Sequence, residues 1–87
     1  MRIVLTGHKG FIGHHYLKHI KDVHDVTTYD IIDGQDLKDK AVVDNMPDCD
    51  VVVHMAATNG TKLFYETPVE VTMNNTLPTM HIVNRHK

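Results

Sequence analysis

A glycine-rich segment near the amino terminus constrains the fold of this chain more than any other feature. The segment TGHKGFIG, residues 6–13, has three evenly spaced glycines and follows the apolar stretch RIVLT. Such a stretch, rich in β-branched residues, is typical of a parallel strand that is covered on both faces. In residues 11–21 the side chains of Ile12, Tyr16 and Ile20 recur every four positions, which predicts an amphipathic helix. The glycines therefore stand at a strand-to-helix turn.

The rest of the chain continues this alternation of strand and helix. Residues 25–30 and the valine-rich residues 50–55 predict two further strands. A short helix is expected over residues 37–46 with Asp36 as its N-cap, and a long helix over residues 68–85. This order predicts an α/β fold, a three-layer Rossmann-like half fold with about three parallel strands and helices on both faces. The first strand is expected in the middle of the sheet.

The long helix has a clear start and an apolar stripe. Thr67, Pro68 and Glu70 form the combination of N-cap, first-turn proline and first-turn acid that is typical of a capped helix. Its stripe is expected to face the core or a subunit interface and consists of Val69, Met73, Leu77 and Met80.

Length and composition narrow the class of protein. Eighty-seven residues leave room for one small domain, residues 1–87, and the hydrophobic and charged fractions, 41% and 23%, are those of a soluble globular chain. No apolar run approaches the roughly 20 residues that span a bilayer, and the short apolar start does not predict a signal peptide. We therefore expect a cytoplasmic protein with no membrane segment. The net charge of −2, without a basic cluster, argues against a nucleic-acid partner.

The glycine turn has the features of a phosphate-binding loop. Gly7 would permit the tight turn, Gly10 would leave room for a diphosphate, and Gly13 would let the helix pack close to the sheet. The backbone N–H groups of Gly10, Phe11 and Ile12 would point at the ligand, where the helix dipole favours negative charge. The same glycines could instead serve only a tight connection between strand and helix.

The acid at the end of the second predicted strand, Asp30, favours a dinucleotide as the ligand. A carboxylate at this position can accept hydrogen bonds from both ribose hydroxyls, and it repels the additional phosphate of NADP. NAD is therefore the expected cofactor and NADP the less favoured one. A nucleoside-triphosphate loop is excluded because it needs lysine and then serine or threonine after the last glycine, where this chain has His14 and His15.

In combination, these stretches resemble the amino-terminal part of the extended short-chain dehydrogenase/reductase family, the NAD-dependent epimerase/dehydratases that act on nucleotide sugars. TGHKGFIG, the acid of TTYD, DLKD, VVVHMAA and NNTLPT carry the resemblance. It implies that Asp30 meets the adenosine ribose and that Asp36 and Leu37 flank the adenine. Ala56 and Ala57 would lie on the ribose and nicotinamide side. The residues implied at the diphosphate are Gly7, Gly10, Phe11, Ile12 and Gly13.

Three departures from the family pattern limit what the resemblance implies. Pro78 replaces the family's glycine in NNTLPT, and only five residues separate Asp30 from Asp36, so a helix and a strand often found there are reduced or missing. Lys9 lies where some NADP-using relatives place a basic residue, which bears on the choice of cofactor. Family catalysis uses a Tyr-x-x-x-Lys pair that exchanges a proton while the nicotinamide takes or returns hydride. Here the residues at the lysine position after the tyrosines are Ile20, Asp33 and Val69. No catalytic residue and no metal ligand is therefore assigned.

We expect a truncated NAD-binding unit that catalyses no reaction alone. Two alternatives stay open: a structural or interaction module that kept the fold but lost the cofactor, and an enzyme part that needs a separately encoded carboxy-terminal half. A third strand without a further neighbour would leave residues 50–55 as an open edge, which invites pairing with another chain. We therefore expect a homodimer through this edge, through the helix of residues 68–85, or through both. The resemblance implies that this helix contributes to a dimer interface.

Overall fold

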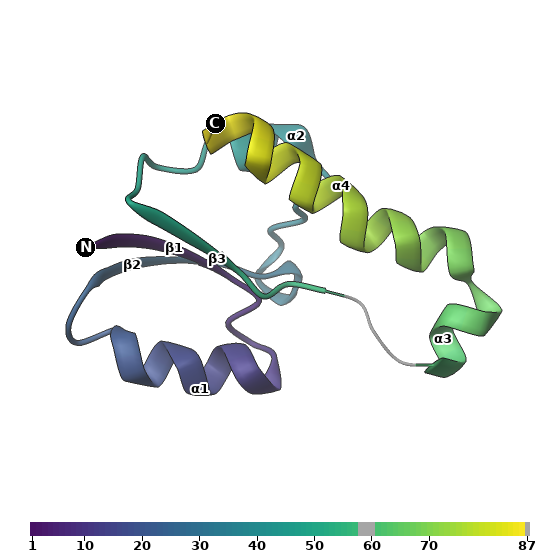
Figure 1. The fold of residues 1–87 in the computed structure, drawn as a ribbon, viewed down its shortest axis with the longest axis horizontal. Coiled ribbons are helices and arrows are strands. Elements are labelled where there is room, and N and C mark those ends of the chain that lie inside the picture. Colours follow the sequence, from purple (N-terminus) through teal and green to yellow (C-terminus); the bar gives the residue numbers. More distant parts are fainter. Residues whose placement is uncertain (58–60, 87) are drawn as a thin grey trace.

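Strands and helices alternate along the chain, as the sequence predicts. The computed structural model describes residues 1–57 and 61–86 (Figure 1). In this part of the chain no helix is long and apolar enough to cross a membrane. The elements are β1 (Arg2–Thr6), α1 (Phe11–Ile20), β2 (Asp25–Tyr29), the 3-10 turn η1 (Ile31–Asp33), α2 (Lys40–Asp44), β3 (Val51–His54), α3 (Thr61–Glu66) and α4 (Pro68–His86).

A three-stranded parallel sheet forms the middle layer, with the strand order β2-β1-β3. The prediction that the first strand lies in the middle is confirmed. Thr6 at the end of β1 is in register with Tyr29 of β2 and with His54 of β3. The carboxyl ends of all three strands therefore meet at one edge of the sheet, which is the edge that binds ligands in open α/β folds.

Helices cover both faces of the sheet, so the predicted α/β half fold is confirmed. Figure 1 shows α1 on one face and α2 with α4 on the other. Because side chains alternate along a strand, β1 directs Val4 toward one layer and its neighbours Ile3 and Leu5 toward the other. The core on the α2 and α4 side consists of Val4, Leu37, Val43, Met46 and Ile82.

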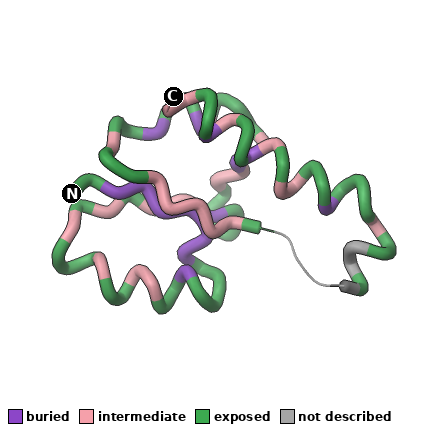
Figure 2. Tube along the Cα trace, in the orientation of Figure 1, coloured by how far each residue is buried: buried purple, intermediate pink, exposed green. Residues whose placement is uncertain are grey.

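The burial of α1 differs from the predicted pattern. Figure 2 shows a long buried stretch along β1 and the turn after it, but little burial along α1. Gly13 is the buried residue of α1, whereas Ile12 is exposed, so the expectation that Ile12 faces the sheet was wrong. The helix is turned so that Gly13 touches the sheet. The half-buried Tyr16 and Ile20 follow on the same face.

The short helix α2 begins later than predicted. Asp36 was expected as its N-cap, but its carboxylate accepts a hydrogen bond from Lys38 N at 3.0 Å and closes a turn before the helix. Asp39 is the actual N-cap, and its carboxylate accepts from Ala41 N at 3.0 Å. Two aspartates with the same local chemistry lie close together here, and the structure uses the second one to start the helix.

The long helix α4 begins at Pro68 as predicted, but it buries a different face. Val71, Pro78 and Ile82 are its buried residues. Two polar contacts fix this inner face on the α2 segment: His81 Nδ1 donates to the Leu37 carbonyl at 3.1 Å, and Arg85 donates to the Met46 carbonyl at 2.8 Å. From the predicted stripe, which was expected in the core or in a subunit interface, Val69, Met73 and Met80 are exposed and therefore lie outside the core of the chain.

Candidate functional site

The turn between β1 and α1 brings backbone against backbone. Gly7 has a φ of +78°, a left-handed conformation that favours glycine, and a Cβ there would lie 2.6 Å from Ala56 N. A Cβ on Gly13 would overlap the carbonyl oxygen of Gly7. The first and last glycines of the motif are therefore required by the turn itself and by the close approach of α1.

The start of α1 offers hydrogen-bond donors to an anion. The first residues of an α-helix, here Phe11 and Ile12, have backbone N–H groups without a helical acceptor. The N-cap residue Gly10 brings no side chain to them, and a Cβ on Gly10 would meet only the Gly7 carbonyl oxygen, at 3.3 Å. The Gly10 N–H was expected to point at the ligand, but it donates to Gly7 O at 3.1 Å. This arrangement suits a phosphate group.

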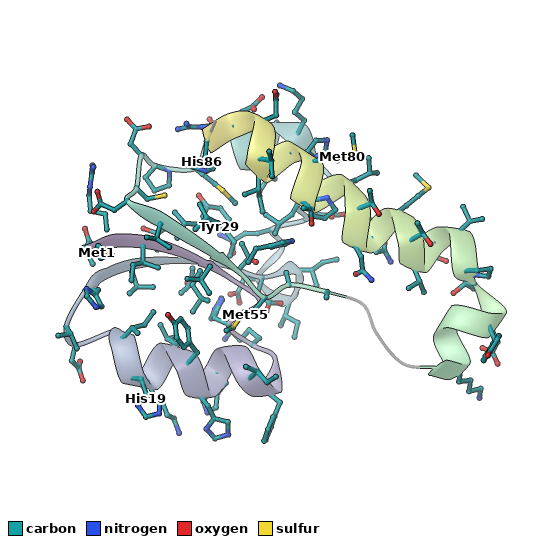
Figure 3. All side chains as sticks on the ribbon, viewed as in Figure 1. Met1, His19, Tyr29, Met55, Met80 and His86 are labelled. Atoms are coloured by element: carbon teal, nitrogen blue, oxygen red, sulfur yellow. The ribbon has the colours of Figure 1, made fainter. Side chains whose placement is uncertain are left out.

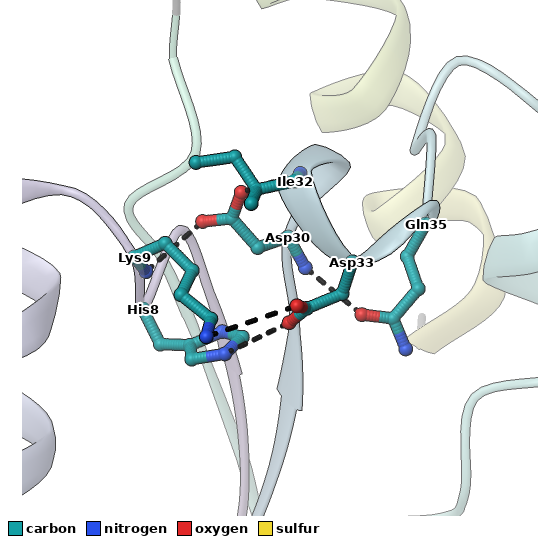
Figure 4. Close-up of polar contacts among 6 residues, drawn as sticks. All are labelled: His8, Lys9, Asp30, Ile32, Asp33 and Gln35. Atoms are coloured by element: carbon teal, nitrogen blue, oxygen red, sulfur yellow. Dashed lines mark hydrogen bonds and ion pairs between the residues drawn. The ribbon is translucent and has the colours of Figure 1, made fainter.

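Asp30 lies directly beside the glycine turn, at the end of β2 (Figure 4). Its side chain holds two segments together: Oδ2 accepts a hydrogen bond from Lys9 N at 3.0 Å, and Oδ1 accepts one from Ile32 N at 3.0 Å. Asp30 is 7% exposed. Because each carboxylate oxygen has two acceptor positions, each keeps one for a ligand hydroxyl.

The end of β3 is fixed by Thr6 of β1, which is fully buried. Its Oγ1 accepts hydrogen bonds from Met55 N and Ala56 N, each at 3.1 Å, and lies 2.6 Å from His54 Nδ1. With both lone pairs in use, the hydroxyl proton goes to Nδ1, so His54 carries its own proton on Nε2. Burial lowers the pKa of His54, which also favours this neutral form. Ala56 is thereby held against Gly7.

The three strand ends enclose a cleft of about 430 Å³. Figure 3 shows Met55, which lines this cleft, where the end of the sheet meets the turn after β1. Phe11, Ile12 and Gly13 are not among the lining residues, because Gly13 is buried under the turn and the other two begin the helix beside it. The predicted residues that line the cleft are Gly7, Gly10, Asp30, Asp36, Leu37, Ala56 and Ala57.

The cleft also contains residues that sequence reasoning missed. Ile31 and Ile32 follow Asp30 directly and are exposed, and such an apolar pair in a polar turn is a signal that could have indicated a ligand surface. Residues of α4 that recur every four positions form one wall, but nothing in the sequence says which helix face meets the cleft. Lys9, which the sequence connected only with the choice between NAD and NADP, also lines the cleft. The missed lining residues are Ile31, Ile32, Gln35, Lys38, Met55, Glu70, Asn74 and Pro78.

The charges around the cleft are mixed. The acids Asp30, Asp36 and Glu70 line it together with the lysines Lys9 and Lys38. Over residues 1–57 and 61–86, no group of three or more histidines, cysteines or acids is arranged to hold a metal ion. Both acceptors and donors of charged hydrogen bonds are therefore present along the cleft.

Comparisons with known proteins agree with this geometry. The sequence profile of the NAD dependent epimerase/dehydratase family matches residues 3–86. The crystal structure of the Thermus thermophilus UDP-glucose 4-epimerase complex with NAD is similar to this chain, with a TM-score of 0.85 and 27% sequence identity. The similarity covers 98% of this chain and 33% of that chain, so this chain spans about a third of its length. None of the curated proteins matches. The profile extends over nearly every residue, and the chain belongs to the NAD dependent epimerase/dehydratase family.

Proposed function

We propose that this chain binds NAD in the cleft at the carboxyl edge of its sheet, as the dinucleotide-binding part of a nucleotide-sugar epimerase/dehydratase. The observation that carries the proposal is that the glycine turn, Asp30 and Ala56 come from three different strand ends and line one cleft. The solved UDP-glucose 4-epimerase that resembles this chain is a complex with NAD, which supports the same ligand here.

The residues of the cleft divide between the parts of a dinucleotide. The N–H groups of Phe11 and Ile12, at the positive end of the α1 dipole, would bind the diphosphate above Gly10. Asp30 would accept hydrogen bonds from the adenosine ribose through the acceptor positions that Lys9 and Ile32 leave open. The adenine would lie near Asp36 and Leu37, and the nicotinamide side near Ala56 and Ala57.

The proposal is one of binding and not of catalysis by this chain alone. NAD, when bound, supplies a hydride acceptor, but none of the three tyrosines has lysine at the fourth following position. Asp30 favours NAD over NADP because a carboxylate beside the ribose repels an additional phosphate. What the chain's own residues contribute is the position and orientation of the dinucleotide.

Titration with NAD and with ADP, followed by calorimetry and thermal unfolding, tests the proposal. A ligand that binds only the folded state stabilises it, by about 2.7 kcal/mol at a hundred times its Kd. Asp30→Asn should weaken binding about tenfold or more, because it removes the charge from an acceptor of hydrogen bonds. Asp25→Asn is the matched control, since Asp25 is exposed and lies at the opposite end of β2. No shift with millimolar NAD or ADP would instead favour a module that lost its cofactor.

Catalysis would require a second polypeptide segment with the Tyr-x-x-x-Lys pair. The chain spans 33% of the solved epimerase that it resembles. The partner that we propose is a separately encoded polypeptide that contains this pair. Mixing this chain with such a polypeptide should restore hydride transfer, measured by NADH absorbance. No transfer in a mixture that forms a stable complex would contradict this partnership.

We further propose that the chain forms a homodimer. Two surfaces support this: the outer face of α4 exposes Val69, Met73 and Met80, and β3 is an edge strand with Val51 exposed. Exposed apolar helix faces and open strand edges both favour association. Whether the chain dimerises and which of the two surfaces forms the interface are separate questions.

Sedimentation equilibrium separates the two surfaces. At tens of micromolar the wild-type chain should have about twice its mass of 9.9 kDa. Met80→Glu should give a monomer if α4 forms the interface, and Val51→Lys should do so if the β3 edge forms it, because each places a charge in an apolar contact. Both residues are exposed, so neither change disturbs the core. A stable wild-type monomer would contradict the homodimer.

A further inference from the structure

The turn η1 contains a second acid, Asp33. Its carboxylate contacts the glycine turn. Its Oδ2 lies 3.1 Å from His8 Nε2, and its Oδ1 lies 3.8 Å from Lys9 Nζ (Figure 4). The His8 side chain is only 10% exposed, whereas 48% of the Lys9 side chain is exposed. Asp33 is therefore fixed by a buried imidazole on one side and engages a lysine of the cleft on the other.

The position of Asp33 is determined by Asp30, the acid proposed at the ribose. The Asp30 carboxylate accepts from Ile32 N at 3.0 Å, and the Asp30 carbonyl accepts from Asp33 N at 3.0 Å. Gly34 closes the turn with a φ of +80° and donates to Ile31 O at 2.9 Å. The two acids are thus parts of one small hydrogen-bonded unit, in which Asp30 lines the cleft and Asp33 does not.

We propose that Asp33 is a specificity-determining residue that favours NAD over NADP and acts through Lys9. This role rests on the proposed NAD site. Lys9 lines the cleft, its backbone N–H bonds to Asp30, and its ammonium lies 3.8 Å from Asp33 Oδ1. A free ammonium there would attract the 2′-phosphate of NADP. Asp33 engages that ammonium and adds a second negative charge next to Asp30.

The geometry favours a role in ligand selection over a role in stability. Lys9 and Asp33 are 3.8 Å apart and both partly exposed, and such pairs contribute little to folding. A 2′-phosphate carries more charge than either side chain. The electric field of this pair should therefore change the affinity for NADP more than it changes the free energy of folding. The other charged residues that line the cleft are Asp30, Asp36, Lys38 and Glu70.

Calorimetric titration with NAD and with NADP tests the role of Asp33. Asp33→Asn should raise NADP affinity about tenfold relative to NAD, because it releases Lys9 and removes one negative charge. Adding Lys9→Gln to Asp33→Asn should remove most of that gain, since the released ammonium is then absent. Asp25→Asn, which removes the same charge at the opposite end of β2, should leave the ratio of the two affinities unchanged.

Lys9→Gln alone gives a second measurement that does not require Asp33→Asn to fold. Because Asp33 already engages Lys9, this change should alter the NADP-to-NAD affinity ratio less than about twofold. A tenfold loss of NADP affinity in Lys9→Gln, or an unchanged ratio in a folded Asp33→Asn, would overturn the role of Asp33 while NAD binding itself stands. A wild-type chain that binds neither dinucleotide would overturn both this role and the proposed function.

Discussion

The corner around the glycine turn and the outer face of α4 are built in opposite ways. In the corner, backbone approaches backbone, and the buried side chains of Thr6 and Asp30 accept hydrogen bonds from the backbone N–H groups of Met55 and Lys9. On the outer face of α4, Val69, Met73 and Met80 are apolar and exposed. The positions in the corner accept only particular residue types, whereas the positions on the outer face of α4 require little more than an apolar side chain.

This difference is the reason why we propose a ligand for the first region and a surface partner for the second. Rigid donors and acceptors at fixed positions are what orientation of a small molecule requires. An apolar helix face without fixed polar groups gives area for association but no position for individual atoms. The most direct test of this contrast is to make the same substitution at two residues of the same type that lie in different environments.

The largest effect is expected from Gly13→Ala. The new Cβ would overlap the Gly7 carbonyl oxygen, which belongs to backbone and cannot rotate away. Overpacking of this kind costs typically 1–3 kcal/mol and occasionally more, so we expect a loss of about 3 kcal/mol in the free energy of unfolding by urea. A chain of this size has little stability in reserve, so the variant should be largely unfolded at 37 °C.

Gly34→Ala is the matched control for that substitution. Gly34, unlike Gly13, has a positive φ, +80°, but among the described residues nothing lies within 4 Å of a Cβ placed there. Only the backbone conformation opposes alanine at this site, which costs about 1 kcal/mol. Equal losses for Gly13→Ala and Gly34→Ala would mean that the approach of α1 to the turn is looser than the structure has it.

The next largest effect compares two methionines on opposite sides of α4. Met46 lies under the inner face of α4 and is 2% exposed, whereas Met80 on the outer face is 59% exposed. Met46→Ala should lower the free energy of unfolding by about 3 kcal/mol because it leaves a cavity in the core. Met80→Ala should change it by less than about 0.5 kcal/mol at a concentration where the chain is monomeric.

Concentration separates burial in the core from burial in an interface. Above the dimer dissociation constant, the cost of Met80→Ala should grow, while the cost of Met46→Ala should stay constant. Equal costs for the two variants in dilute solution would show that the outer face of α4 is covered within one chain. That result would remove the contrast between the two regions.

The corner could be predicted from the sequence because its residues are dictated by local backbone geometry. A strand, three spaced glycines, a helix and an acid after the next strand form one unit, and the structure brings Gly7, Gly10 and Asp30 together in one cleft. The sheet order follows from the same unit, because parallel crossovers leave few arrangements for three strands.

Other parts could not be predicted, since hydrophobic spacing does not say which of two apolar faces lies inside. On α4 the stripe of Val69, Met73 and Met80 has the same helical spacing as the buried stripe of Val71, Pro78 and Ile82. Only the packing of α2 against α4 decides between them. The helix start at α2 was missed for a similar reason, because Asp36 and Asp39 have the same capping chemistry.

The smallest expected effect is that of His54, which lies in the corner around the glycine turn. Its Nδ1 accepts the Thr6 hydroxyl proton at 2.6 Å, and burial lowers its pKa below the ordinary value of 6.5. Between the lowered folded-state pKa and 6.5, the unfolded chain binds more protons than the folded chain. The stabilising contribution is therefore present above pH 6.5 and is lost as the pH falls through the folded-state pKa.

His54→Asn isolates this contribution, because the Asn carbonyl oxygen can accept the Thr6 proton but does not titrate. Unfolding by urea between about pH 7 and about pH 5 should show a flatter pH dependence in the variant than in the wild type. Some slope should persist, since burial and Arg85 also lower the pKa of His86, opposed by Asp48. Equal slopes in wild type and variant would mean that the pKa of His54 does not differ between the folded and the unfolded chain, which would contradict the effect of burial on this group.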